Sequence, residues 1–479
     1  MSITIRISGS RYLWLKRLLK LELSPKGFLL LSFVLSFIVR LVPELTFPVP
    51  VGFDTALYVA GAKYNPYPSF EFRILQKFIL PYVYHVLGID LIFFMKIFAP
   101  LVHALITMLM MLYAIRILSW SRTRLLVLML LLSLSPAILR MAWDTHSQNL
   151  ATLMLAGMLL IMGKRLTFVK FLSIMPVLAL IALTHQLVSV IALVILFAEV
   201  SASVKRAREF VPMTFIFLAC LLIVVYLDPV LNPLKVSMRV MTAISPQATS
   251  PITPQTLALQ GLVATWYIAP AAVVGVFKER RLLAWTITSI GVFLAGFFLA
   301  NPVPLVPGRW IVYSSIPLAF FASNAITKKG SWKKSLAVIF IILTLSTGFG
   351  MLLPTGTPVT SIMHKAYPEM PETLASSTAK KEHIEAIIEF TRYLNIMDRE
   401  GCLVTHYPWF FWWSWYFYEG KTLYNGPSYT TEQSLKTFVE TRATKCSNTY
   451  VIWFTGLTWA KEIKRIGELA LYEYQPTRG

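Results

Sequence analysis

Long apolar runs separated by short loops fill the first 353 residues of the chain. They lie at residues 27–43, 88–115, 124–139, 148–163, 168–183, 187–203, 210–227, 259–277, 282–300, 309–326 and 335–353. A helix needs roughly 20 apolar residues to cross the hydrocarbon core of a bilayer, which is about 30 Å thick. The sequence therefore predicts an α-helical polytopic membrane protein with about eleven spans. The mean hydropathy of +0.64 excludes an ordinary soluble globule.

The distribution of positive charge predicts how these spans are oriented. The formal net charge of +21 falls entirely in residues 1–353, because residues 354–479 hold 13 basic and 13 acidic side chains. One alternate set of loops holds 22 of the basic residues, at residues 6–26, 116–124, 164–170, 205–208, 278–281 and 328–334. Loops rich in Lys and Arg stay in the cytoplasm. We therefore predict a cytoplasmic N-terminus and an extracytoplasmic C-terminus, and the basic charge requires no nucleic acid as a partner.

The chain divides into two domains, a transmembrane domain of residues 1–353 and an outer domain of residues 354–479. The second part alternates between helical and strand patterns. Strands are predicted at residues 402–406, 421–424, 449–454 and 471–474, and helices at residues 381–394, 409–418, 434–441 and 459–469. This alternation is typical of a small α/β domain with a mainly parallel sheet. Cys402 and Cys446 both fall in this domain, where a disulfide is permitted, and whether they are bridged stays open.

Three segments outside the spans have patterns of their own. Residues 11–20 and 72–86 are predicted to form amphipathic helices at the membrane surface. No small-residue cleavage site follows the first of them, so it is not interpreted as a signal peptide. Residues 228–258 contain SPQATSPITP, whose prolines and small polar residues indicate a mobile loop that can cover a site.

Acidic residues are scarce on the predicted outer side, so each one needs a physical reason. They are Glu44, Asp54, Glu71, Asp90, Asp144 and Asp228. Asp54 lies in the motif GFDTALY, shortly after the first span and among apolar and aromatic neighbours. Its carboxylate either caps a loop or serves as a general base or metal ligand. Tyr58 ends the same motif and is a candidate for an acceptor site.

Asp144 and His146 follow the third span in an Asp-x-His spacing, which places both side chains on one face of extended backbone. With Asp54 they form three ligands suited to Mn²⁺ or Mg²⁺, with water and a phosphate completing the shell. Alternatively, Asp144 caps the following span and His146 binds a loop carbonyl. The pattern therefore predicts either a divalent cation or a structural pair.

Three arginines depart from the predicted charge bias on the outer side. Arg309 begins a span, Arg140 ends one, and Arg73 lies in the first outer loop. Each is either a snorkelling anchor or a ligand for a phosphate at the membrane surface. His185, between two apolar halves, is either a hydrogen-bonded structural group or a further acceptor-site residue. The aromatic run 409–418 fits either stacking on sugar rings or packing against the membrane part.

The order of these features resembles the GT-C superfamily of integral membrane glycosyltransferases over the whole chain. Asp54 with Asp144 and His146 is similar to the metal site of archaeal oligosaccharyltransferase catalytic subunits. The oligosaccharyltransferase signature WWDYG is absent, because residues 412–416 read WWSWY. A protein O-mannosyltransferase-like, aminoarabinose-transferase-like or lipid-linked glycan-extending enzyme therefore fits as well as asparagine-linked transfer.

The resemblance implies inverting transfer of a sugar, hexosyl or related, from a polyprenyl-phosphate donor such as a dolichol-phosphate sugar. The acceptor would be a lipid-linked glycan, a protein or a glycolipid. Asp54 and Asp144 would be catalytic, and Arg309, with Arg140 and Arg73, would bind the donor phosphate.

Two other classes of protein stay open. A transporter or flippase of lipid-linked glycans would also bind a lipid phosphate, although the inverted repeats typical of transporters are not evident. A noncatalytic assembly subunit with a lectin-like outer domain would bind sugar without needing Asp54. Clustering of Asp54, Asp144 and Arg309 at one surface favours transfer, whereas acidic residues that line a path through the membrane favour transport.

Overall fold

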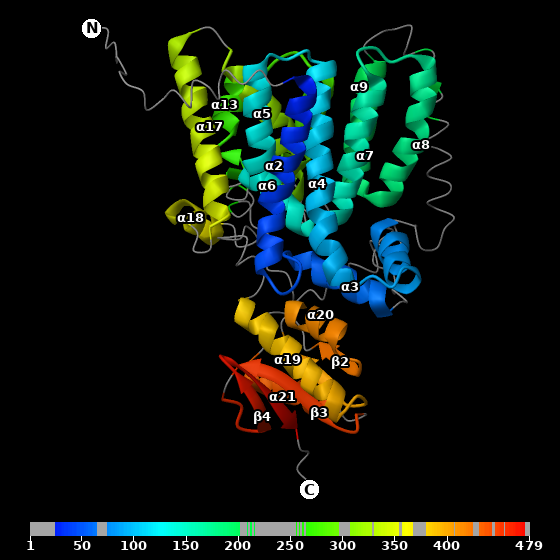
Figure 1. Cartoon of the computed structure of the whole chain (residues 1–479), viewed down its shortest axis with the longest axis vertical. Coiled ribbons are helices and arrows are strands. Elements are labelled where there is room, and N and C mark those ends of the chain that lie inside the picture. Colours follow the sequence, from blue (N-terminus) through cyan, green and yellow to red (C-terminus); the bar gives the residue numbers. More distant parts are fainter. Residues whose placement is uncertain are drawn as a thin grey trace, which may run out of the picture.

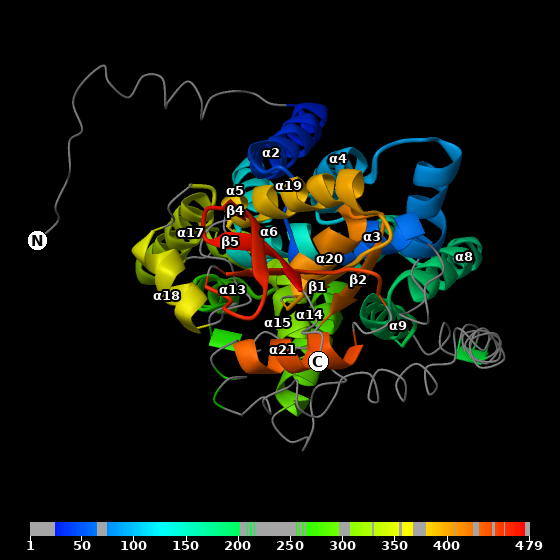
Figure 2. The same cartoon turned by 90° about the horizontal axis from the view of Figure 1, so that it is seen from below.

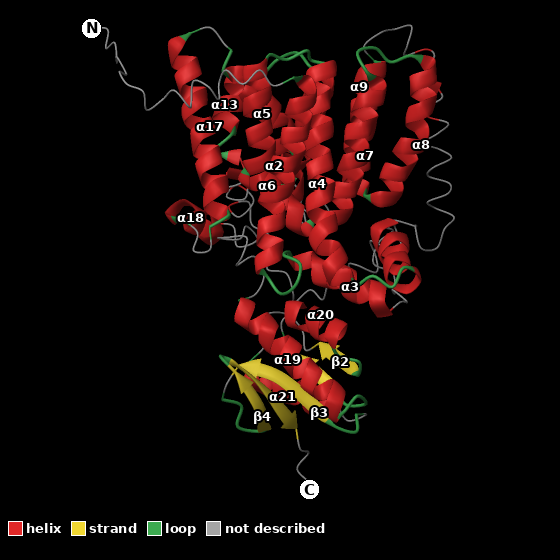
Figure 3. Ribbon diagram, viewed as in Figure 1, coloured by secondary structure: helices red, strands yellow, loops and turns green. Residues whose placement is uncertain are grey.

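The computed structural model of the chain shows a helical bundle with a smaller domain at one end (Figure 1). It describes residues 24–64, 74–201, 265–296, 307–327, 330–353, 357–366, 380–406, 408–424, 431–442, 446–454 and 456–474, with single helical positions between 208 and 262. Among these described residues, strands occur only in the smaller, C-terminal domain (Figure 3). The predicted segments 11–20 and 228–258 and the side chain of Arg73 lie outside the described residues, apart from positions 255 and 258.

The bundle is built from helices that follow the predicted apolar runs. Its described helices are α2 (Pro25–Thr46), α4 (Leu91–Arg116), α5 (Arg122–Leu134), α6 (Pro136–Asp144), α7 (His146–Met162), α8 (Phe168–Thr184), α9 (Gln186–Val200), α13 (Ala269–Gly275), α14 (Arg280–Ala295), α15 (Pro307–Tyr313), α16 (Ser315–Ala325) and α17 (Ser331–Met351). Within the described part of the chain, three helices are long and apolar enough to cross a membrane: Pro25–Thr46, Leu91–Arg116 and Trp332–Met351. The bent pair α5 and α6 makes a fourth if it is counted as one span, and α7, α8 and α9 are shorter apolar helices. These helices make the chain an integral membrane protein.

The basic connections share one end of the bundle. The turn from α4 to α5, the turn from α7 to α8 and the start of α17 all lie at the end away from the C-terminal domain (Figure 1). Lys164 in the second of these turns donates a hydrogen bond to Ser119 in the first, at 3.3 Å. The alternation of charge therefore separates the two ends of the bundle in space.

The end of the bundle that faces the C-terminal domain carries short helices. They are α3 (Phe53–Tyr64), the helical turns η2 (Leu75–Ile79) and η3 (Tyr82–Val86), and α18 (Pro358–Ala366). The helix predicted over residues 72–86 is confirmed from Leu75 onward, as two successive π-helical turns. Asp90 ends this connection and caps α4, because its carboxylate accepts a hydrogen bond from the Phe93 N–H at 2.9 Å.

The C-terminal domain has a five-stranded sheet in the order β2-β1-β3-β5-β4. The strands are β1 (Cys402–Thr405), β2 (Lys421–Tyr424), β3 (Thr449–Phe454), β4 (Lys461–Ile466) and β5 (Leu469–Tyr474), and the helices are α19 (Lys381–Met397), α20 (Pro408–Phe417) and α21 (Glu432–Arg442). Strand β1 pairs in parallel with both β2 and β3, as predicted. A disulfide joins Cys402 to Cys446, whose Cα atoms lie 5.8 Å apart.

The helix predicted over residues 459–469 is wrong. These residues form β4 and the turn into β5, and both strands pair antiparallel, so the sheet is mixed rather than mainly parallel. The turn contains Gly467 with a φ of +59°, a conformation that suits glycine and reverses the chain too tightly for a helix. The ion pair between Arg465 and Glu462 lies on the exposed edge strand, where charged residues limit pairing with other chains.

One hydrophobic core continues from the bundle into the C-terminal domain. Tyr58 of α3 and Leu139 of α6 belong to the same cluster of buried side chains as Phe410 and Trp413 of α20 and Met351 of α17. In the view from the C-terminal end, the domain covers the middle of the bundle's end, close to α3 and α6 (Figure 2). The C-terminal domain is therefore packed directly on the elements that carry the predicted site.

Candidate functional site

A hydrogen bond joins the two segments that carry Asp54 and Asp144. The Thr55 hydroxyl in the first turn of α3 lies 2.6 Å from Nε2 of His146, the first residue of α7. Both side chains are buried, with exposed fractions of 0% and 2%. Asp54 directly precedes Thr55, and Asp144 lies two residues before His146, so this bond brings the backbones at both aspartates together. The side chains of Asp54 and Asp144 themselves are outside the described set.

The corner between α6 and α7 is held by its own side chains. The Thr145 hydroxyl donates to the Met141 carbonyl at 2.9 Å, and the Asn149 amide donates to the same carbonyl at 2.6 Å. These bonds replace helical hydrogen bonds that the chain loses where it turns. These side chains therefore fix the corner. Asp144 is the last residue of α6 and His146 is the first residue of α7, so the predicted extended backbone at this spacing is wrong.

Two buried tyrosines lie beside the corner between α6 and α7. Tyr58, one turn after Thr55, presents its ring edge-on to the imidazole of His146, with ring centroids 5.6 Å apart. Tyr313 at the end of α15 is 1% exposed, and its hydroxyl faces the hydroxyls of Thr145 and Thr152. Helix α15 thus meets the α6 to α7 corner, and Tyr58 of α3 lies close enough to the Tyr313 hydroxyl to interact with it electrostatically.

Arg309 reaches the site from α15. It lies one turn before Tyr313 and is close enough to interact electrostatically with the Tyr313 hydroxyl, as is Tyr58. Arg140 lies one turn before Asp144 on α6, and both arginines are partly exposed. Helix α15 packs on α6, so the two arginines lie on neighbouring helices. The structure therefore places Asp54, Asp144, Arg140 and Arg309 on elements that converge at one end of the bundle.

His185 has a structural role in addition to any contact with a substrate. Its Nδ1 accepts a hydrogen bond from the Leu187 N–H at 3.2 Å, and the residue caps the start of α9. This arrangement favours the structural interpretation of His185 over the interpretation as an acceptor-site residue.

The predicted cation site has one ligand whose geometry the structure describes. Nε2 of His146 is occupied by the Thr55 hydroxyl, so a metal would bind the ring through Nδ1 or would displace Thr55. Among the described residues, no three His, Cys, Asp or Glu side chains form a group that could hold a metal ion. The cation ligands Asp54 and Asp144 are outside that search, and the cation stays a prediction.

The aromatic helix α20 packs on α3. The Lys63 ammonium donates to the Tyr416 carbonyl at 2.6 Å and lies 4.8 Å from the centre of the Tyr416 ring. Tyr64 donates to the carbonyls of Tyr416 and Tyr418, and its ring stacks on Trp415. Burial lowers the pKa of Lys63, while the carboxylates of Glu419 and Asp90 raise it.

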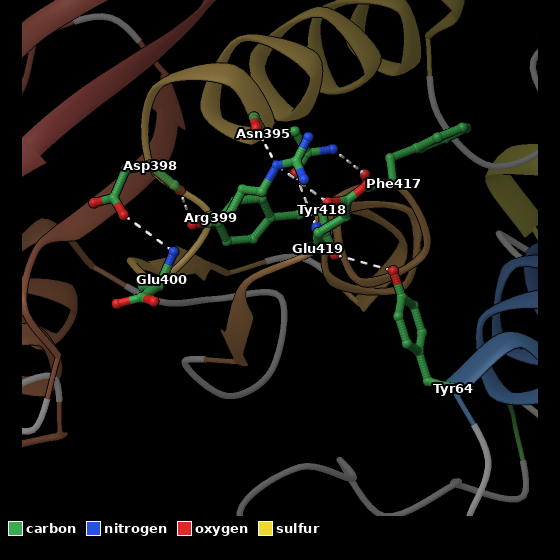
Figure 4. Close-up of polar contacts among 8 residues, drawn as sticks. All are labelled: Tyr64, Asn395, Asp398, Arg399, Glu400, Phe417, Tyr418 and Glu419. Atoms are coloured by element: carbon green, nitrogen blue, oxygen red, sulfur yellow. Dashed lines mark hydrogen bonds and ion pairs between the residues drawn. The ribbon is translucent and has the colours of Figure 1, made fainter.

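The same contacts extend into the C-terminal domain (Figure 4). Asn395 at the end of α19 donates to the Phe417 carbonyl at 2.8 Å and accepts from the Glu419 N–H at 2.9 Å. Arg399 forms an ion pair with Glu419 at 3.3 Å. The end of α3 away from Asp54 is thereby bound to the C-terminal domain, and packing of the run 409–418 against the membrane part is confirmed.

A buried histidine follows the first strand of the C-terminal domain. His406 is 1% exposed, and its ring centroid lies 4.0 Å from that of Trp453 on β3. Burial lowers the pKa of His406 to about 3, so the imidazole is neutral at physiological pH.

Sequence reasoning missed Thr55, Tyr313 and Arg40. Thr55 adjoins Asp54 in the motif, and Tyr313 lies four residues after Arg309, the helical spacing that puts two side chains on one face. Arg40 interrupts the first apolar run, and an ionisable residue inside a span is itself a signal of function.

The structure is similar to that of ArnT from Cupriavidus metallidurans bound to undecaprenyl phosphate. The TM-score is 0.52 at 11% sequence identity, and the match covers 98% of this chain and 99% of ArnT. A match to the mycobacterial arabinofuranosyltransferase AftD has a TM-score of 0.43 at 12% identity and covers 93% of this chain but 41% of AftD. No protein-family model matches the sequence, and no curated protein matches it.

The likeness to ArnT extends from end to end of both chains, and it shows that this chain shares the fold of that structure. The chain is an integral membrane protein of that fold.

Proposed function

We propose that this protein is a membrane glycosyltransferase that moves a sugar from a polyprenyl-phosphate donor to an acceptor. The observation that carries the proposal is the shared fold with ArnT over nearly the whole of both chains, since the ArnT structure holds undecaprenyl phosphate. The bond between Thr55 and His146 supports the proposal, because it brings together the segments that carry Asp54 and Asp144. A transferase needs acidic and basic groups together at one surface.

The proposed topology follows the charge pattern. The N-terminus is cytoplasmic, about eleven helices span the membrane, and residues 354–479 form an extracytoplasmic α/β domain. The site then lies at the extracytoplasmic surface, because α3 and the α6 to α7 corner are at the same end of the bundle as that domain (Figure 1). A lipid-linked donor in the outer leaflet would present its phosphate at this depth.

The proposed reaction is an inverting transfer. The acceptor oxygen or nitrogen forms a bond to the anomeric carbon of the sugar while the bond from that carbon to the phosphate oxygen breaks. Asp54 takes the proton of the acceptor, and Asp144 orients the acceptor or assists as a second carboxylate. Arg309 and Arg140, with Arg73, stabilise the negative charge that grows on the leaving phosphate.

A divalent cation, Mn²⁺ or Mg²⁺, is proposed as a further component. Asp54 and Asp144 would be its principal ligands, because hard cations prefer carboxylate oxygens. His146 would bind the cation only through Nδ1, or through Nε2 after its hydrogen bond to the Thr55 hydroxyl is broken. When bound, the cation would add positive charge at the leaving phosphate.

Replacement of Asp54 tests the proposal. Purified protein in lipid nanodiscs is supplied with undecaprenyl-phosphate-linked sugars, and release of undecaprenyl phosphate is measured. A general base contributes about 10²- to 10⁴-fold to a rate, so Asp54→Asn should lose at least about 100-fold. Glu400→Gln, an exposed carboxylate of the C-terminal domain, should behave as wild type. Equal rates for wild type and Asp54→Asn would overturn the assignment.

A further inference from the structure

The span formed by α5 and α6 is broken at a proline. Helix α5 ends at Leu134, α6 begins at Pro136, and the two are bent by 52°. Proline has no N–H and clashes with the carbonyl four residues earlier, which is how a proline breaks a helix. Helix α6 leads to the Asp144 corner, so this break sets the direction in which the corner points.

The break leaves backbone groups without helical partners inside the membrane. The Leu132 carbonyl would accept from residue 136, which is a proline, and the Ser133 carbonyl would accept from Ala137. The Ala137 N–H instead donates to the Tyr267 hydroxyl at 3.0 Å. An unsatisfied backbone group in hydrocarbon costs several kcal/mol, so the two carbonyls need other donors.

Arg40 of α2 supplies those donors. Its guanidinium donates to the Leu132 carbonyl at 3.2 Å and to the Ser133 carbonyl at 3.4 Å, and it also binds Ser36 on its own helix. The side chain is fully buried, with an exposed fraction of 0%, and none of the described ion pairs involves it. Besides Ser36, its hydrogen-bond partners are carbonyls at the end of α5, which carry partial negative charge.

A third element closes on the same break. The Thr344 hydroxyl of α17 donates to the backbone carbonyl of Tyr267 at 2.9 Å, which holds Tyr267 in place. Gly348, one turn further on α17, lies so close to the break that a Cβ there would overlap the Leu134 carbonyl. The break is thus enclosed by α2, α17 and Tyr267.

We propose that Arg40 and Tyr267 are positioning residues, which hold α6 at the angle that brings Asp144 to Asp54. This inference rests on the proposed transfer reaction. Helix α6 has nine residues and is about 13 Å long, so straightening the 52° bend would move Asp144 by on the order of 10 Å. A misplacement of only 1 Å can reduce a rate about 100-fold, so a small loss of angle is sufficient to impair the reaction.

The test compares Arg40→Met, Arg40→Lys and Tyr267→Phe with the control Arg165→Lys, an exposed side chain at the other end of the bundle. Full-length protein in nanodiscs is measured for kcat and for KM of the undecaprenyl-phosphate-linked sugar. Hydrogen exchange of residues 137–144 reports on α6 directly. It needs no activity, so it distinguishes failure of this inference from failure of the proposed function.

Arg40→Met should lower kcat by about 100-fold per folded molecule, change KM by less than about 3-fold, and speed exchange in α6 but not in α9. Lysine offers one point charge instead of a planar fork, so Arg40→Lys should restore only part of kcat. Tyr267→Phe should speed exchange at Ala137 and lower kcat less than Arg40→Met does.

Unchanged exchange in α6 for Arg40→Met would overturn the inference, and so would an activity loss equal to the loss of folded protein. If Arg40→Met does not fold, Arg40→Lys and Tyr267→Phe decide by the same measurements. If wild type transfers no sugar, the proposed function fails while the exchange data still decide whether Arg40 holds α6.

Discussion

Replacement of Thr55 by valine removes a hydrogen bond that joins α3 to the α6 to α7 corner. The hydroxyl lies 2.6 Å from Nε2 of His146, and both side chains are buried. Valine keeps nearly the same shape but leaves the imidazole nitrogen without this partner. Loss of one partner of a buried hydrogen bond costs about 1–3 kcal/mol. If that free energy appears in the activation barrier, the transfer rate falls roughly 5- to 150-fold.

Thr55→Ser is the matched control, because it retains the hydroxyl and loses only a methyl group. We expect Thr55→Ser to keep most of the wild-type rate and Thr55→Val to lose kcat. The assay is release of undecaprenyl phosphate by purified protein, with thermal unfolding measured in parallel to separate lost activity from lost folding. A valine variant within about 2-fold of the wild-type rate, or a serine variant impaired as much as the valine variant, would show that the Thr55 hydroxyl does not support transfer.

Three further predictions concern the C-terminal domain and its contact with α3. Reduction of the disulfide between Cys402 and Cys446, 44 residues apart, should destabilise the domain by about 4 kcal/mol in the chain-entropy model, and equal unfolding temperatures with and without reductant would contradict this. Because the pKa of His406 is about 3 when folded and about 6.5 when unfolded, the unfolded state binds the extra proton between these values. The domain should keep its full free energy of unfolding above pH 6.5 and lose about 1.4 kcal/mol of it for each pH unit below that value. The variant His406→Gln should remove this pH dependence. A free energy of unfolding that does not change between pH 7 and pH 5 would disprove the prediction. Lys63→Met should weaken the packing of α20 on α3 by roughly 1–2 kcal/mol, which should be seen as faster hydrogen exchange in α20. The control Lys381→Met, on the exposed face of α19, should leave this exchange unchanged. Identical exchange in both variants would count against the contact between Lys63 and α20.

The lengths of the apolar runs predicted the helices of the membrane part well, because the thickness of the bilayer sets the length of a spanning helix. The first predicted run, residues 27–43, lies within α2, and the run 88–115 matches α4 to within a few residues. The run 124–139 was predicted as one span, yet Pro136 breaks it into α5 and α6. Hydropathy does not register such a break, and the sequence signal for it was the proline itself.

Strand and helix patterns predicted the C-terminal domain less evenly. Strands β1, β2 and β3 were found because their β-branched and aromatic residues are bounded by turns. The residues of β4 were assigned to a helix because KEIKRIGEL mixes charged and apolar residues at a spacing that also suits a helix. Pairing with β5, a tertiary interaction, overrides that local preference.

The site was predicted at the level of segments but not of contacts. The charge pattern placed the loops of Asp54 and Asp144 on one side of the membrane, and the bond between Thr55 and His146 confirms that these segments meet. The hydrogen-bond partner of His146 depends on the packing of α3 against α6. No local sequence pattern encodes this packing. Arg40 was missed for a similar reason, since its carbonyl partners lie 92 and 93 residues away in the chain.

The position of a bound lipid phosphate would show whether α3, α6 and α15 form the donor site. A cryo-electron microscopy structure of the full chain with added undecaprenyl phosphate would locate it. We expect the phosphate to lie among α3, α6 and α15, in contact with the Arg309 guanidinium and close to Asp54. A phosphate bound at the end of the bundle that carries the basic loops, or on a surface away from these helices, would show that the donor site is elsewhere.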